Sequence, residues 1–95
     1  MLVLPEELMQ SQATACLRML VQGLRAQSGP DVVVDASALT RFDSAALAVL
    51  LEFRRESLAL GKLFWVRGLP ERLGNLASLY GIVDLLSSEL PTTVK

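Results

Sequence analysis

Residues 31–60 read DVVVDASALTRFDSAALAVLLEFRRESLAL, and this stretch decides the fold. The three consecutive valines at 32–34 are β-branched and predict a short buried strand. Asp35 and Ser37 follow with side chains that favour turns. Residues 45–60 contain neither Gly nor Pro and consist mainly of Ala, Leu, Glu and Arg, which favour a helix. The stretch therefore predicts a strand, a short loop and a helix, in that order.

Asp43 and Ser44 stand immediately before this helix. An acid or hydroxyl side chain at that position accepts hydrogen bonds from the open N–H groups of the first helical turn. We therefore expect Asp43 and Ser44 to cap the helix. The hydroxyl of Ser44 would lie at the positive end of the helix dipole, beside the end of a strand. This corner is the first candidate for a functional site.

On the amino-terminal side, residues 2–4 read as a short strand closed by Pro5. A helix is expected next, and Ser28-Gly29-Pro30 ends it. Its apolar positions recur at the spacing of one buried helical face. They are Ala13, Cys16, Leu17, Leu20, Val21 and Leu24.

On the carboxyl-terminal side, residues 63–66 predict a third strand. Another helix is expected to begin near Pro70 and to end at Gly81. Residues 82–86 read as a final strand, and residues 87–95 are expected to be loosely held. The predicted buried face of this last helix consists of Leu69, Leu73, Leu76, Ala77 and Tyr80.

The alternation of strands and helices predicts an α/β fold, with a small, largely parallel sheet and three main helices in a single domain spanning residues 1–95. The pattern leaves open whether the helices cover one face of the sheet or both. A chain of this length buries roughly 60–65% of its unfolded surface.

Composition excludes several classes of function. The net charge of −1 gives no basic stripe for binding nucleic acid. One cysteine and no histidine exclude a disulfide framework and the usual zinc sites. There is no apolar run of about 18 residues and no secretory signal, so we expect a cytoplasmic protein.

The chain also lacks the residues that catalysis usually requires. No histidine is available as a general base, and no glycine-rich loop is present to bind a dinucleotide or a phosphate. Ser44 lies between Phe42 and Ala46 two positions away on either side, where a nucleophile elbow would have glycines. We therefore expect no catalytic residues, no cofactor, no metal and no small-molecule substrate.

A protein–protein contact is the remaining expectation. Leu47, Leu50, Leu51 and Leu58 form one stripe of the central helix and are expected to face the core. Small apolar residues next to its polar start, off that stripe, are typical of a docking surface. The alternative is that other elements of the same domain cover these positions. The predicted docking face consists of Ser44, Ala45, Ala48, Val49 and Glu52, with Tyr80 as an extension.

The stretch VVVDASALTRFDSAALAVLLEF, residues 32–53, resembles the STAS domain family. In that family an Asp-Ser/Thr pair opens a helix after a hydrophobic strand, usually as D-S-[ST]-G-L. Asp43, Ser44 and Leu47 match this pattern, whereas Ala45 and Ala46 replace the second hydroxyl and the glycine. The resemblance covers most of residues 8–86, with a shortened amino-terminal strand region.

Within the family, residues 43–56 and 68–86 are most similar to the small STAS subunits of Mla-type phospholipid-transport ABC complexes. This resemblance implies a non-enzymatic cytoplasmic subunit that binds the ATPase of such a complex at the inner membrane and reaches the membrane only through it. It implies as an alternative an anti-sigma-factor antagonist that is regulated by phosphorylation of Ser44. Self-association stays open.

Overall fold

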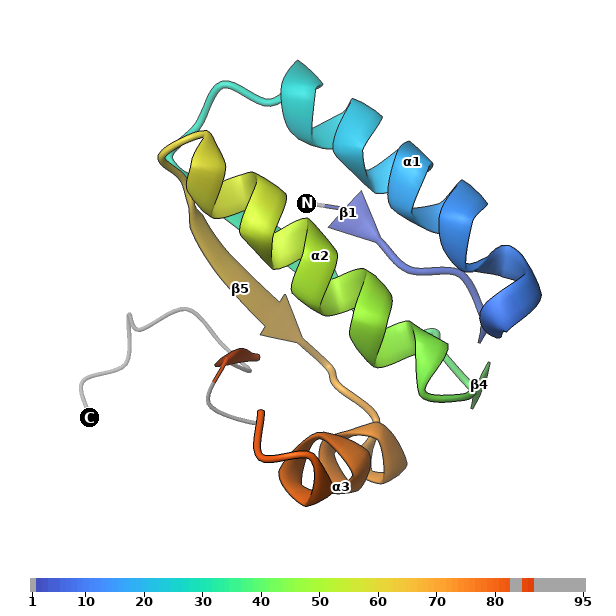
Figure 1. Cartoon of the computed structure of the whole chain (residues 1–95). Coiled ribbons are helices and arrows are strands. Elements are labelled where there is room, and N and C mark those ends of the chain that lie inside the picture. Colours follow the sequence, from blue (N-terminus) through green and yellow to red (C-terminus); the bar gives the residue numbers. More distant parts are fainter. Residues whose placement is uncertain (1, 83–84, 87–95) are drawn as a thin grey trace.

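A computed structural model describes residues 2–82 and 85–86 of the chain. Among these residues, five short strands and three helices follow one another in an α/β arrangement (Figure 1). In chain order they are β1 (Leu2–Val3), β2 (Glu7–Leu8), α1 (Gln10–Ala26), β3 (Asp31–Asp35), β4 (Arg41–Phe42), α2 (Ala45–Ala59), β5 (Leu63–Arg67) and α3 (Glu71–Leu79). Within the described residues, no helix is long and apolar enough to cross a membrane.

The main sheet is parallel, with the strand order β1–β3–β5. Val34 of β3 lies opposite Leu2 on one side and Val66 on the other. Because side chains alternate between the two faces of a strand, Val32 and Val34 share one face, and both are fully buried. The valine run therefore forms the centre of the sheet, as its composition predicts.

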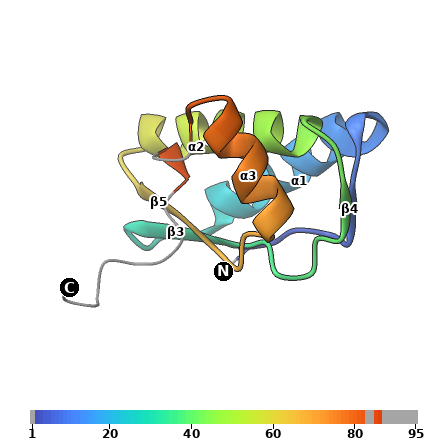
Figure 2. The ribbon, with the colours of Figure 1, turned by 90° about the horizontal axis from the view of Figure 1, so that it is seen from below.

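Helices α1 and α2 lie side by side on one face of this sheet (Figures 1 and 2). Phe53 of α2 meets Phe64 of β5 edge to face, with ring centroids 6.1 Å apart. Offset or edge-on aromatic contacts of this kind add to the gain from burial. The sequence left open whether the helices cover one face of the sheet or both, and α1 and α2 lie on the same face. Helix α3 lies beyond the carboxyl end of β5 (Figure 1).

A second, two-stranded parallel sheet joins β2 to β4. Leu8 pairs with Phe42 in this sheet, directly before the residues that start α1 and α2. The sequence does not predict these strands, because two residues are too few to show a period of two. Their effect is to place the amino-terminal ends of both helices next to each other.

The expected helices and the strands expected at residues 2–4, 32–34 and 63–66 are confirmed. The strand expected at residues 82–86 is not found where the structure describes that segment. The N–H of Leu85 instead donates to the carbonyl of Ile82 in a turn, and Leu86 is buried. Residues 83–84 and 87–95, to which the remaining predictions for this region apply, lie outside the described residues.

Candidate functional site

The carboxylate of Asp43 caps two helices. Its Oδ1 accepts a hydrogen bond from the backbone N–H of Ala45, at 2.8 Å, in the first turn of α2. Its Oδ2 accepts one from the N–H of Gln10, at 3.2 Å, which begins α1. The open N–H groups of a helix's first turn carry partial positive charge, so a carboxylate is favourable there. The predicted cap by Asp43 is confirmed and extends to a second helix.

Ser44 does not cap α2 with its side chain. Its backbone is already helical, with φ −63° and ψ −16°, and the hydroxyl makes no cap hydrogen bond. A capping residue normally has an extended backbone, which lets its side chain fold back onto the first turn. The prediction that Ser44 caps the helix is therefore wrong, since Asp43 does so from one residue earlier. Ser44 is exposed, and its hydroxyl is accessible from solvent.

The predicted docking face of α2 is only partly at the surface. Ala48 is exposed, and Ala45 and Glu52 are half-buried. Val49, however, retains only 3% exposure and belongs to the hydrophobic core, so its assignment to an exposed face is wrong. Helix α1 packs along α2 (Figure 1), and α2 also contacts β5, so more of the surface of α2 is covered within the domain than the sequence predicts.

The buried stripe of α2 also differs from the expected one. Leu47 and Leu50 are buried as predicted, but Leu58 is 43% exposed. Phe53 and Ser57, which the sequence did not assign to the core, are fully buried. The hydroxyl of Ser57 donates to the carbonyl of Phe53 at 2.8 Å, which satisfies the polar group inside the core. The spacing of positions 46, 50, 53 and 57 is that of one helical face, and it could have predicted this buried stripe.

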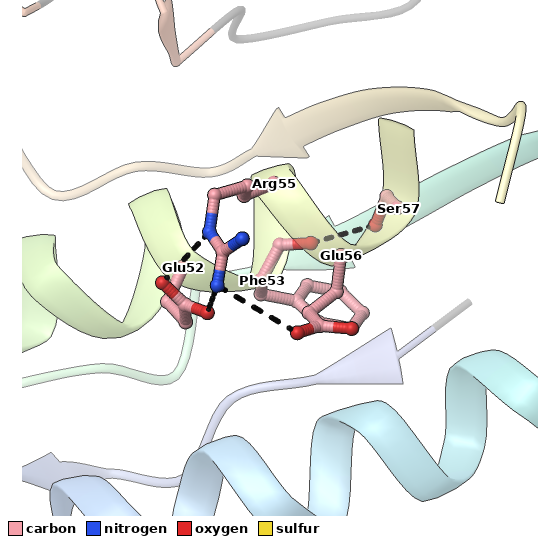
Figure 3. A network of polar contacts seen from close by, with 5 residues as sticks. All are labelled: Glu52, Phe53, Arg55, Glu56 and Ser57. Carbon is pink, nitrogen blue, oxygen red and sulfur yellow. Dashed lines mark hydrogen bonds and ion pairs between the residues drawn. The ribbon is translucent and has the colours of Figure 1, made fainter. Parts of the chain in front are cut away.

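Glu52 forms an ion pair with Arg55 of the same helix. Figure 3 shows Glu52 and Glu56 on either side of Arg55, whose guanidinium forms ion pairs with both carboxylates. The hydrogen bond from Arg55 lowers the pKa of Glu52, and the same contact raises the pKa of Arg55. Because these side chains are exposed, the pairs contribute little to stability. Glu52 therefore already has a partner, and the residues of the predicted face that are exposed at α2 itself are Ser44 and Ala48.

A groove not predicted from the sequence lies between α3 and the end of β4. Its volume is about 360 Å³. The lining residues are Phe42, Arg72, Asn75, Leu76 and Leu79. Phe42 stands two positions before Ser44, so the groove adjoins the amino-terminal end of α2.

Large apolar residues of α3 lie both in the core and at the surface. One face places Leu73 and Ala77 in the core, with no exposed surface. The other carries Leu76 toward the groove and leaves Leu79 78% exposed and Tyr80, the next residue, 58% exposed. The prediction that Tyr80 belongs to the buried face is therefore wrong. The one residue that could have indicated this surface from the sequence is Leu79, a large apolar residue outside the predicted buried face.

The carboxylates at the other strand ends form local contacts. Asp31 accepts a hydrogen bond from the indole N–H of Trp65 at 3.1 Å. Asp35 accepts one from the N–H of Ser37 at 2.9 Å, as its turn position predicts, and hydrogen bonding by Ser37 lowers its pKa. Within residues 2–82 and 85–86, no three His, Cys, Asp or Glu side chains gather as metal ligands would.

Comparison with known proteins identifies the family. The model of a family described as "Mlab, STAS domain" matches residues 1–87. No curated protein matches the chain. The matched span includes the sheet, all three helices, the Asp43–Ser44 corner and the groove beside α3. The chain therefore belongs to the STAS domain family, and its similarity is to the MlaB-related STAS domains.

Proposed function

We propose that this chain is a non-enzymatic STAS subunit that binds the cytoplasmic ATPase of an Mla-type ABC phospholipid-transport complex and supports its assembly or activity. The observation that carries the proposal is the exposed apolar surface at the end of α3, with Leu79 78% and Tyr80 58% exposed, next to the groove that Phe42 also lines. Membership in the MlaB-related STAS family supports the choice of partner. STAS domains are in general non-enzymatic.

The docking surface in this proposal consists of Ser44 and Ala48 of α2 and Leu76, Leu79 and Tyr80 of α3. The two small residues allow a partner helix to approach α2 closely. The large residues offer apolar area and an aromatic ring, which are enriched at the centres of protein interfaces. Lipid is handled by the other subunits of the complex. The chain is cytoplasmic and reaches the inner membrane only through them.

The test is a binding measurement between the purified chain and the purified ATPase of an Mla-type complex from the same organism. Ala48→Glu is expected to remove binding and to leave the thermal melt unchanged, because Ala48 is exposed in the isolated chain. Ala15→Glu is the matched control, an exposed alanine within α1. Binding by Ala48→Glu equal to that of the control would show that the partner binds elsewhere.

A second candidate is an anti-sigma-factor antagonist. It is favoured by the hydroxyl of Ser44, which is exposed, makes no cap hydrogen bond and lies at the amino-terminal end of α2. A phosphate there would add a charge of about −2 to the docking surface and oppose association. Phosphate mapped to Ser44 in cells, with loss of partner binding by Ser44→Asp, would favour this candidate over the first.

A further inference from the structure

We infer that the groove beside α3 receives an apolar side chain of the ATPase together with a neighbouring Asp or Glu, whose carboxylate pairs with Arg72. This inference rests on the proposed function, since it names the chemistry of the partner segment at that same surface. It combines two features of the groove: its apolar lining residues, and Arg72, which forms no ion pair with another residue of the described ranges 2–82 and 85–86.

The groove is built by one face of a regular helix. Arg72, Asn75, Leu76 and Leu79 of α3 stand three, four and seven positions apart, which is the spacing of side chains that share a helical face. Phe42, at the end of β4, completes the lining. Because Leu73 and Ala77 fix the other face of α3 in the core, the groove is held in place by packing.

Arg72 supplies the charge. Its guanidinium carbon lies 5.0 Å from the centroid of the Phe42 ring, a cation–π contact that orients the side chain. Among residues 2–82 and 85–86, the ion pairs involve Arg55, Glu52 and Glu56, and Arg72 takes part in none. A guanidinium has five N–H donors. The aromatic ring does not accept hydrogen bonds from these donors in the way that an oxygen atom would. These donors are available to a partner.

The lining selects a single carboxylate. One guanidinium can bind a carboxylate through two parallel hydrogen bonds. The described residues that line the groove include no second cation, whereas a phosphate, with its charge of about −2, is commonly bound by clustered cations. Phe42, Leu76 and Leu79 would bury an apolar side chain next to this pair, and the amide of Asn75 supplies a further donor and acceptor.

The exposure of Leu79 favours a protein segment over a free small molecule. At 78% exposure, Leu79 forms an open rim of the groove, and a ligand that filled only the groove would leave much of it in water. A helix or loop laid across α3 would cover Leu79 and the adjacent Tyr80 as well. The occupant is thus a segment of the ATPase with an apolar residue and an acidic residue on one face.

The experiment measures the affinity of the purified ATPase for Arg72 variants. Arg72→Met keeps an apolar stem over Phe42 but removes the charge, and we expect a loss of about tenfold or more. Arg72→Glu places like charges together, and we expect a loss of about a hundredfold or more. Arg72→Lys should retain part of the affinity. Arg55→Met is the matched control, because Arg55 is exposed and paired within α2, and it should change affinity less than about twofold.

Two further readouts separate charge from packing. The affinity of the native chain should fall as salt is raised, and that of Arg72→Met should fall less steeply. Substitution of the partner acid by Arg, found by scanning acidic residues of the ATPase, should restore binding to Arg72→Glu. Equal salt dependence of the native chain and Arg72→Met would overturn the assignment of a carboxylate.

The possible failures are distinguishable. If Arg72→Met and Arg72→Glu bind as tightly as the native chain while Ala48→Glu does not bind, the inference about the groove is wrong and the proposed function stands. If the native chain does not bind the ATPase at all, both are wrong.

Discussion

The carboxylate of Asp43 accepts a hydrogen bond from the backbone N–H of Gln10, which precedes it by 33 positions. Since its other oxygen binds the N–H of Ala45, one side chain joins the first turns of α1 and α2. This corner, which the sequence marks as a simple helix cap, is thus also a contact between the two helices that cover the sheet.

We expect Asp43→Ala to lower the free energy of unfolding by about 1–2 kcal/mol, because two helix N–H groups lose their acceptor. Ser44→Ala should change it by less than about 0.5 kcal/mol, because the hydroxyl of Ser44 makes no cap hydrogen bond. Urea denaturation of both variants measures the difference. A larger cost for Ser44→Ala than for Asp43→Ala would show that the hydroxyl caps α2 in solution.

Neighbouring positions of α2 should respond oppositely to charge. Val49→Arg is expected to unfold the domain, since Val49 is only 3% exposed and an unpaired buried charge costs several kcal/mol. Ala48→Glu should remain folded, because Ala48 is exposed. Leu50→Ala, which truncates a fully buried side chain, should cost about 2–5 kcal/mol. Circular dichroism melts of the three variants provide the measurement, and a folded Val49→Arg would place Val49 at the surface after all.

Gly68, which follows β5, should tolerate no side chain. Its φ is +68°, and an added Cβ would lie 2.8 Å from the Cβ of Ser37 and 3.1 Å from its backbone N. Gly68→Ala therefore combines backbone strain with a clash against the turn after β3, and we expect a cost above about 1 kcal/mol.

Gly29→Ala is the control for that substitution. Apart from Gly29 and its two chain neighbours, no atom of the described residues lies within 4 Å of the position that its Cβ would take, and its φ is not positive. It should be neutral or stabilise the fold by up to about 1 kcal/mol, because alanine restricts the unfolded chain. Equal melting temperatures for the two variants would contradict the close approach at Gly68.

The pKa of Asp35 should lie below its ordinary range in the folded protein, chiefly because Ser37 hydrogen-bonds to the carboxylate. A pKa that is lower in the folded than in the unfolded state adds stability above the unfolded pKa, and this contribution is lost as the pH falls through the folded pKa. NMR titration of the carboxyl carbon measures the shift. Ser37→Ala should raise the pKa of Asp35 toward its ordinary value, and an unchanged pKa in that variant would assign the shift to another cause.

The helices and the central strands could be predicted because their patterns are long or strong. The valine run before the Asp43 cap and the regular apolar spacing of α1 both depend on local chemistry. The flank of α2 that α1 covers could not be predicted, because helix periodicity shows which residues share a face but not which neighbour packs there. Val49 was placed on an exposed face and Phe53 was left out of the core, although both are buried and Phe53 packs against Phe64 of β5.

The position of the groove beside α3 could not be predicted from the sequence, for a related reason. Phe42 and Arg72 are 30 positions apart in the sequence, and their contact depends on how α3 is placed after β5. A lone arginine in a short helix is most simply interpreted as a solvated charge. Only the ring beneath it, together with Leu79 at its edge, indicates a binding surface.

The parallel pairing of the first strands has a consequence for the order in which the chain folds. Leu2 pairs with Val34 and Leu8 with Phe42, so each pairing closes a loop that contains all of α1. The entropy of such a loop must be overcome before its contacts contribute, whereas α1 forms from local contacts alone. The first eight residues can therefore join the fold only after β3 and β4 are available. Once they have joined, Leu4 and Leu8 are buried in the native core.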